Sequence, residues 1–249
     1  MRIGGITGIS TVDWYGNVSL VVFFAGCNFR CPYCQNSGLI PLESGEEVSL
    51  ELLQKRIEYE LNLIDAAVFT GGEPLLQPDD LKEAAKLVKD YDLKLMLDTN
   101  GSIPRVVEQL LDLHLIDRVA LDVKAPLTAE EYKKAAGLQY ESEAIVKGIR
   151  RTLKLCNRYD IEIEARTTVA PTISDDSNFI RRIAQEIKGR CAVYYLQQFD
   201  NTGEVLSSEL KSMSPPPREK MIELAEVAIR EGLKDVYIKT RNMGLEKID

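Results

Sequence analysis

The sequence predicts an α/β protein in which strands and helices alternate around a parallel sheet. Segments rich in β-branched and aromatic residues recur along nearly the whole chain, and segments with helical periodicity lie between them. Repeated strand–helix units form parallel sheets with the helices on the outside. A full or partial βα barrel fits this pattern best, and a doubly wound open sheet is the alternative.

Seven segments have the composition and length of buried strands. They are residues 18–25, 66–70, 93–98, 118–123, 161–169, 192–198 and 233–239. Residues 161–169 alternate strictly, and one face of this segment carries Glu162, Glu164, Arg166 and Thr168. That face is either exposed to solvent or turned into a polar barrel interior, and the second arrangement suits a barrel that binds a charged cofactor.

Helices are predicted between the strands by apolar stripes at three- and four-residue steps. One stripe comprises Phe179, Ile180, Ile183, Ala184 and Ile187, and another comprises Met221, Ile222, Ala225, Ala228 and Ile229. Thr128, followed three residues later by Glu131, is a capping-box signature that opens a further helix. The Ser-Pro-Pro-Pro run at 214–217 is typical of the stiff start of a late helix.

Length and composition indicate one domain. A chain of 249 residues that is 45% hydrophobic can bury one substantial core, and no linker-like break interrupts it. We therefore expect a single domain over residues 1–249. Its core lies at about 18–199, and residues 200–249 form a C-terminal helix and strand extension that no chemical motif marks.

Charge and hydropathy argue against two classes of partner. The formal net charge is −8, which does not favour the broad Lys- and Arg-rich surface that nucleic acid requires. The longest apolar run, residues 20–25, is too short to span a bilayer, and the N-terminus has no secretory signal pattern. We expect a cytoplasmic protein without membrane or nucleic-acid partners.

Polar or glycine-rich motifs follow four of the predicted strands, where ligands bind in either architecture. They are Gly26-Cys27, Gly71-Gly72-Glu73-Pro74, Asp98-Thr99-Asn100-Gly101 and Asp122-Val123-Lys124. The carboxyl ends of parallel strands meet at one edge, so these motifs are expected to converge on one rim.

Three of the five cysteines, Cys27, Cys31 and Cys34, lie within eight residues. An odd number with such crowding indicates metal or redox chemistry in a reducing compartment rather than a disulfide framework. Closely spaced cysteines ligate cubane iron-sulfur clusters. Three thiolates on a four-iron cube leave one iron without a protein ligand, and that position is open to a substrate or cofactor, as in catalytic zinc sites. Cys156 and Cys191 are expected to be inert thiols in apolar surroundings.

Three other interpretations of these cysteines are weaker. A glutaredoxin-like dithiol of Cys31 and Cys34 leaves Cys27 and the later strand ends unexplained. Structural zinc normally has four protein ligands, and the only histidine, His114, lies far along the chain. A packed core strand is disfavoured because polar residues and a proline interleave the three thiols.

The cysteine spacing, with Tyr33 directly before the third cysteine, resembles the signature of the radical S-adenosylmethionine (SAM) superfamily. The Gly-Gly-Glu-Pro motif at 71–74 strengthens the resemblance. In that superfamily a [4Fe-4S] cluster binds SAM at its open iron, and reductive cleavage yields a 5'-deoxyadenosyl radical that abstracts a hydrogen atom. The resemblance implies a partial (βα)6-type TIM barrel of the radical SAM kind, with Cys27, Cys31 and Cys34 as cluster ligands.

The glycine motif and two later motifs are the expected SAM contacts. Glycines allow the backbone to approach a ligand closely, although an ordinary strand-to-helix turn is the alternative. In the superfamily this motif contacts the amino end of SAM. The residues expected to bind SAM, in part by this resemblance, are Tyr33, Gly71, Gly72, Glu73, Pro74, Asp98, Thr99, Asp122, Lys124 and Arg166.

The segments around Ser10-Thr11-Val12-Asp13, Asp98 and Asp122 resemble, more narrowly, the activating enzymes of glycyl radical proteins. In that family the two later segments surround the SAM carboxylate and a monovalent cation. Alternation places Asp122 and Lys124 on one face of their strand, so they can meet in a polar pocket, although an Asx turn and a surface ion pair remain the alternative.

Two departures narrow the assignment. Some activating enzymes have a histidine where this chain has Leu196-Gln197-Gln198-Phe199, and many carry additional cysteine-rich clusters, for which five cysteines leave no room. Both features resemble the activating proteins of anaerobic ribonucleoside-triphosphate reductase. The resemblance implies a glycyl radical enzyme as protein substrate and a flavodoxin- or ferredoxin-type electron donor. The rivals are a radical SAM enzyme that acts on a nucleobase, tRNA or other small substrate, and a non-catalytic module with a structural cluster or zinc.

Overall fold

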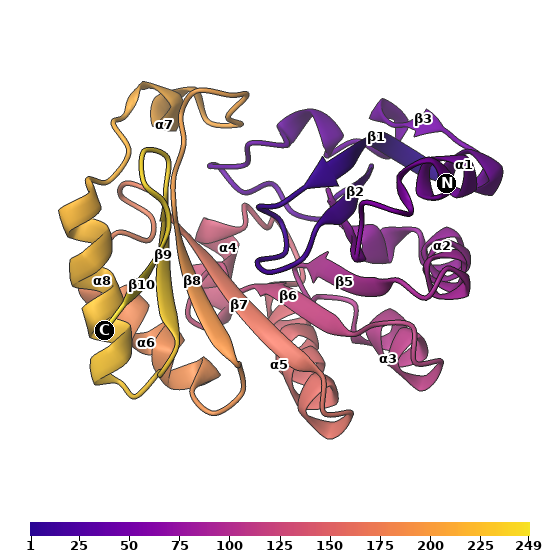
Figure 1. The fold of residues 1–249 in the computed structure, drawn as a ribbon. Coiled ribbons are helices and arrows are strands. Elements are labelled where there is room, and N and C mark those ends of the chain that lie inside the picture. Colours follow the sequence, from indigo (N-terminus) through magenta and orange to yellow (C-terminus); the bar gives the residue numbers. More distant parts are fainter.

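Seven parallel strands form the centre of the sheet in the computed structural model, which describes residues 1–249 (Figure 1). They are β2 (Ser19–Phe24), β4 (Ala66–Gly71), β5 (Lys94–Thr99), β6 (Arg118–Asp122), β7 (Glu162–Val169), β8 (Val193–Gln198) and β9 (Val236–Thr240). These are the seven strands that the sequence predicts, and they stand side by side in chain order.

Three further strands complete the sheet in antiparallel pairings. β1 (Arg2–Ser10) pairs with β2, β3 (Glu46–Glu47) pairs with β1, and β10 (Gly244–Ile248) pairs with β9. Sequence patterning did not predict them. β1 contains three glycines, which weaken its strand signal. Two of these pack against other side chains, because a Cβ on Gly4 would lie 2.2 Å from the end of the Leu39 side chain and one on Gly8 would lie 2.0 Å from the Glu60 carboxylate.

The strand order is β10-β9-β8-β7-β6-β5-β4-β2-β1-β3, and no pairing joins the two edges. A doubly wound sheet would reverse its strand order part-way, and this sheet does not. Six strand–helix units, begun by β2, β4, β5, β6, β7 and β8, are followed by β9. The fold is therefore the partial βα barrel that was expected.

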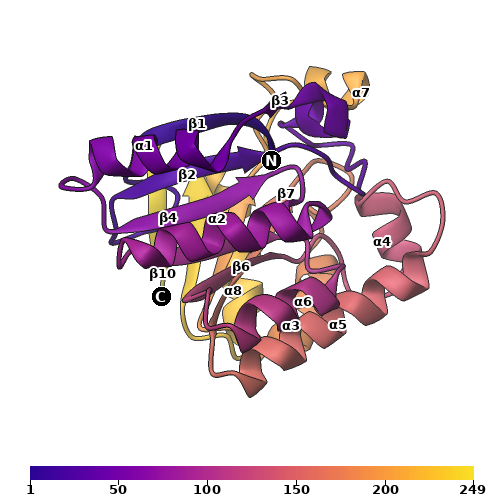
Figure 2. The same cartoon turned by 90° about the vertical axis from the view of Figure 1, so that its right-hand side faces the viewer.

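Helices cover the outer face of the sheet. They are α1 (Leu50–Glu60), α2 (Pro78–Asp90), α3 (Pro104–Asp112), α4 (Ala129–Ala135), α5 (Ser142–Arg158), α6 (Ser177–Ile187) and α8 (Arg218–Arg230). The short α7 (Ser208–Ser212) lies instead above the strand ends (Figure 1), and the 3-10 turns are η1 (Ser37–Leu39), η2 (Leu42–Ser44) and η3 (Pro74–Leu76). α1 and α2 run along the strands in Figure 2, and α6 and α8 cover β8 and β9 in Figure 1. None of the helices combines the length and the apolar character that a membrane span requires.

Helix starts follow the signals in the sequence. The Thr128 side chain accepts from the backbone N–H of Glu131 and caps α4, as the capping box predicts. α8 begins directly after Pro217. Asp176 caps α6 by accepting from two backbone N–H groups.

Two apolar cores lie on opposite faces of the sheet. The larger one fills the space between the strands and the outer helices. The smaller one lies in the barrel interior and comprises Trp14, Val21, Ala66, Val68, Met96 and Ala120. Val21, Val68 and Met96 are register partners on β2, β4 and β5, so they form one layer. Trp14 comes from the β1–β2 loop and is 5% exposed, so this loop fills part of the barrel interior.

Candidate active site

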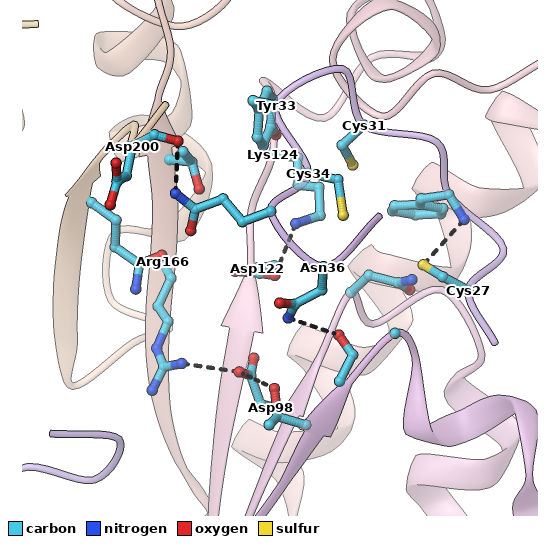
Figure 3. Close-up of a pocket in the computed structure, with 18 of the residues that line it drawn as sticks. Cys27, Cys31, Tyr33, Cys34, Asn36, Asp98, Asp122, Lys124, Arg166 and Asp200 are labelled. Carbon is cyan, nitrogen blue, oxygen red and sulfur yellow. Dashed lines mark hydrogen bonds and ion pairs between the residues drawn. The ribbon is translucent and has the colours of Figure 1, made fainter. Parts of the chain in front are cut away.

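The predicted motifs meet at a cavity of about 450 Å³ at the carboxyl ends of the parallel strands. Figure 3 shows side chains from both sides of this cavity. The sequence-predicted residues that line it are Cys27, Cys31, Tyr33, Cys34, Gly71, Gly72, Asp98, Thr99, Asp122, Lys124 and Arg166. Glu73 and Pro74 lie behind the wall of the cavity and do not line it.

The cysteine loop is held by backbone hydrogen bonds to two other parts of the chain. The Cys27 N–H donates to the carbonyl of Ile40 at 2.9 Å, and the Arg30 N–H donates to the carbonyl of Ala136, just after α4, also at 2.9 Å. Within the loop, the Cys34 N–H donates to the Cys31 carbonyl at 3.0 Å. These hydrogen bonds fix the loop to the scaffold at both its start and its middle.

The three thiols face the cavity as free cysteines. Burial raises the pKa of Cys27 to about 12 and that of Cys31 to about 11, so cluster ligation must release their protons. No set of three His, Cys, Asp or Glu side chains converges on one point that could hold a single metal ion. Three thiols on one wall of a cavity fit a larger, multi-iron group.

The two glycines of the 71–74 motif pack against the backbone at the end of β2. An added Cβ would lie 2.3 Å from the Phe24 carbonyl oxygen at Gly71 and 2.1 Å from the Gly26 carbonyl oxygen at Gly72. The N–H of Glu73 donates to the same Gly26 carbonyl at 2.7 Å. The sequence predicted that these glycines allow close approach of a ligand. In the structure, the space for their side chains is taken by the chain itself, next to Cys27.

Glu73 ties the end of β4 to the end of β5. Its Oε1 accepts from the Thr99 hydroxyl at 2.6 Å and from the Leu75 N–H at 3.2 Å, and its Oε2 accepts from the Asn100 N–H at 2.7 Å. The side chain is fully buried. Burial raises the pKa of Glu73 to about 7, although these three hydrogen bonds favour the charged form.

A chain of amides links the cysteine loop to the turn after β5. Asn100 Nδ2 donates to Asn28 Oδ1, and Asn28 Nδ2 donates to the Ser102 hydroxyl, both at 2.9 Å. The Ser102 N–H in turn donates to Asn100 Oδ1. Both asparagines belong to motifs that the sequence predicts, but their contact could not be predicted because only the fold brings them together.

Two carboxylates face the cavity, each paired with a cation. Asp98 Oδ2 accepts from the Thr70 hydroxyl at 2.8 Å and from Arg166 Nη1 at 3.1 Å (Figure 3). Asp122 accepts from Lys124 Nζ at 2.8 Å, which agrees with their expected position on one face. Burial raises the pKa of Asp98 to about 6, against the effect of Arg166. Burial opposes the charge on Lys124, but Asp122, Cys31 and Tyr33 together outweigh it and raise the pKa of that ammonium.

The end of β8 and the C-terminal extension together supply the far wall of the cavity, which the sequence did not predict. Its lining residues on β8 and β9 and in the adjoining loops are Gln197, Gln198, Asp200, Lys239, Thr240 and Arg241. Gln197 and Lys239 are register partners. Residues 200–207 also close over the cysteine loop, because the Leu206 N–H donates to the Cys34 carbonyl and the Ser207 N–H donates to the Pro32 carbonyl.

Comparison with known proteins agrees with this geometry. A family profile described as the radical SAM superfamily matches residues 21–183. Over 240 residues, 96% of each chain, the sequence is 34% identical to a Methanocaldococcus jannaschii protein provisionally named a glycyl-radical enzyme activating enzyme. It is 32% identical over 191 residues to the pyruvate formate-lyase-activating enzyme of Clostridium pasteurianum, covering 75% of this chain and 76% of that one.

A solved structure shares the fold at low identity. A radical SAM methyltransferase from Sphaerobacter thermophilus matches 91% of this chain and 67% of its own, with a TM-score of 0.71 at 12% identity. Such a likeness concerns the fold alone. The profile match and the relative that is similar over nearly the full length show that the chain belongs to the radical SAM superfamily and, within it, to the family of glycyl-radical enzyme activating enzymes.

Proposed function

We propose that this protein activates a glycyl radical enzyme by removing a hydrogen atom from a backbone glycine of that partner. The observation that carries the proposal is the wall of three free thiols on a cavity whose floor holds Asp98, Asp122 and Lys124. The relative that is 34% identical over almost the whole chain carries the name of such an activating enzyme, which supports the same function.

The cofactors are a [4Fe-4S] cluster and SAM, which when bound supply a reductively generated organic radical. Cys27, Cys31 and Cys34 would hold the cluster. Gly71, Gly72 and Thr99 would form one side of the SAM site with the ring of Tyr33, because all four residues line the cavity. Glu73 and Pro74 would act from behind the wall by fixing the end of β4.

The charged floor of the cavity would bind the polar end of SAM. That end carries both an amino and a carboxylate group, and the floor offers two carboxylates together with Lys124 and Arg166. A monovalent cation between Asp98 and Asp122 is a further part of this proposal. Two carboxylates on one cavity favour it, and it would add a third cationic partner beside Arg166 and Lys124.

Anaerobic ribonucleoside-triphosphate reductase is the partner that we propose. The five-cysteine count leaves no room for additional clusters, and glutamines occupy the end of β8, where some activases have histidine. A flavodoxin- or ferredoxin-type protein would donate the electron. Three free thiols in one cavity favour a reducing, cytoplasmic setting.

The test is anaerobic reconstitution with iron and sulfide, followed by reduction and incubation with SAM. We expect conversion of SAM to 5'-deoxyadenosine, and we expect Cys27→Ala, Cys31→Ala and Cys34→Ala each to abolish it. Cys156→Ala is the matched control, because Cys156 is fully buried on α5 and does not line the cavity. If all three variants still converted SAM, the proposed site would be wrong.

The partner is tested by electron paramagnetic resonance. A glycyl signal should appear with the anaerobic ribonucleotide reductase and be absent when pyruvate formate-lyase is supplied instead. SAM cleavage without a glycyl signal on either protein would favour a small-molecule or RNA substrate. No cleavage at all would favour a non-catalytic module.

A further inference from the structure

A row of alternating charges crosses the barrel interior below the cavity. Arg118 on β6 lies next to Glu164 on β7, Glu164 binds Arg166 on the same strand, and Arg166 binds Asp98 on β5. Thr70 on β4 ends the row by donating to Asp98. Five side chains from four neighbouring strands are therefore connected through their polar atoms.

Arg166 is held at three points. Its Nε donates to Glu164 Oε1 at 2.6 Å, its Nη1 donates to Asp98 Oδ2 at 3.1 Å, and its Nη2 donates to the Asp13 carbonyl at 3.2 Å. A planar guanidinium bound in this way has a fixed orientation. Burial lowers the pKa of Arg166, but Asp98 and Glu164 outweigh it and raise the pKa above its ordinary value.

Asp98 presents one oxygen to the cavity. Both of its protein hydrogen bonds go to Oδ2, from Thr70 and from Arg166. Oδ1 accepts no hydrogen bond from the protein, and it is not among the buried unsatisfied atoms. Since Asp98 lines the cavity, Oδ1 is available to a donor on a ligand. The orientation of the carboxylate, and so the direction of Oδ1, depends on how firmly Thr70 and Arg166 hold Oδ2.

We propose that Glu164 is a positioning residue for the SAM site, acting through Arg166 on Asp98. This inference rests on the proposed function, which assigns Asp98 to SAM. Glu164 itself does not line the cavity and is 3% exposed. Its role is to hold the guanidinium in the plane from which Nη1 reaches Asp98.

Glu164 lies between the guanidinium groups of Arg118 and Arg166 and contacts both. Arg118 Nε lies 3.5 Å from Glu164 Oε2 and has no hydrogen-bond partner, although it is buried. Neutralising Glu164 would leave Arg118 and Arg166 without the anion between them, and removing one partner of a buried ion pair leaves an uncompensated charge. Arg166 would then keep only the neutral Asp13 carbonyl as a firm contact apart from Asp98, and its hold on Asp98 Oδ2 would weaken.

The test is Glu164→Gln, with SAM affinity measured by equilibrium dialysis on the anaerobically reconstituted protein. We expect the Kd for SAM to rise about ten-fold. The substitution loosens Arg166, which in turn weakens the charge-assisted hydrogen bond between Asp98 and SAM. Glu162→Gln is the matched control. It lies two residues away on the same face of β7, but it is largely exposed and contacts only Arg118, at 3.8 Å. Its Kd should stay within about two-fold of wild type.

A double-mutant cycle separates positioning from a general loss of structure. If Glu164 acts through Asp98, Glu164→Gln should not weaken SAM binding further in an Asp98→Asn background. Additive effects of the two substitutions would overturn the inference. So would a Glu164→Gln affinity equal to that of wild type.

Two further outcomes keep the inference distinct from the proposed function. Failure of the wild-type protein to bind SAM would overturn the proposed function and, with it, this inference. If Glu164→Gln does not take up iron, the same cycle is run with Glu164→Asp, which keeps the charge but shortens the side chain. A loss of SAM affinity that disappears in the Asp98→Asn background would again support positioning, and any other result would contradict it.

Discussion

Replacing Gly72 by alanine should damage the cysteine loop through a backbone clash. The added Cβ would lie 2.1 Å from the carbonyl oxygen and 2.7 Å from the carbonyl carbon of Gly26, and 3.2 Å from the carbonyl oxygen of Leu39. Ordinary contacts of this kind begin near 3.4 Å, and all three atoms belong to the backbone. Side-chain rotation cannot relieve the overlap, so the end of β4 and the start of the cysteine loop must separate.

The expected cost follows from overpacking. Inserting a methyl group into a well-packed site destabilises by about 1–3 kcal/mol. For a chain of this size, each kcal/mol lowers the melting temperature by about 2–4 °C, so we expect a decrease of about 2–12 °C. Gly26 directly precedes Cys27, and a shift there moves the first thiol relative to the other two. Iron uptake should therefore fall as well.

The assay is thermal unfolding of the metal-free protein by circular dichroism, with iron content measured after anaerobic reconstitution. Gly203→Ala is the matched control, because a Cβ at Gly203 meets nothing within 4 Å and its φ is not positive. If Gly72→Ala melted at the same temperature as Gly203→Ala and bound as much iron, the packing argument for the 71–74 motif would be wrong.

Three other predictions concern the same cavity. The pKa of Glu73 in the fold is about 7, above the ordinary 4.5, so its contribution to stability is full below pH 4.5 and is lost as pH rises through 7. Urea denaturation should show that the free energy of unfolding of wild type falls by about 3 kcal/mol over this interval relative to that of Glu73→Gln. An equal pH dependence of unfolding in the two proteins would contradict the raised pKa. The pKa of Asp98, about 6, is also raised, so this carboxylate is charged only above that pH; SAM affinity measured by dialysis should fall as pH decreases through about 6 and should lose this dependence in Asp98→Asn. Cys31→Ala should prevent cluster uptake, measured as iron and sulfide per chain, whereas Cys156→Ala should leave it unchanged.

The parallel strands could be predicted because each carries its own signal. Their β-branched and aromatic runs lie between turn residues, and most predicted boundaries fall within one or two residues of the observed ones. The exception is β9, which begins at Val236 rather than at 233, because the preceding residues belong to the turn after α8. β1 was not predicted because its glycines have low strand propensity. They occur there because β1 packs closely against α1 and η1.

Residues that line the cavity were predictable where they sit in contiguous motifs. The three cysteines and the residues after β4, β5 and β6 occur as short runs whose chemistry can be read locally. The far wall could not be found in this way. Lys239 lines the cavity because β9 continues the parallel sheet beside β8 and brings it into register with Gln197, more than forty residues earlier in the chain.

The polar face of β7 was open to two interpretations, and burial decides between them. Glu164 is 3% exposed and Arg166 lines the cavity, so this face is the barrel interior rather than a solvated surface. Elsewhere in the interior, the layer of Val21, Val68 and Met96 on β2, β4 and β5 is apolar and packs with Trp14. The buried charges therefore gather in the part of the interior next to the cavity, where Asp98, Asp122 and Arg166 line it.

Stability does not explain these charges. Three acidic groups, Asp98, Asp122 and Glu164, lie beside three basic groups, Arg118, Lys124 and Arg166, so the interior is neutral when all are ionised. Replacing buried ion pairs by apolar residues of similar volume is often neutral or stabilising. A barrel that only needed to fold could be filled with apolar side chains throughout, as it is around Trp14. Fixed, balanced charges are useful where a ligand with both positive and negative groups has to be bound in one orientation, and SAM is such a ligand.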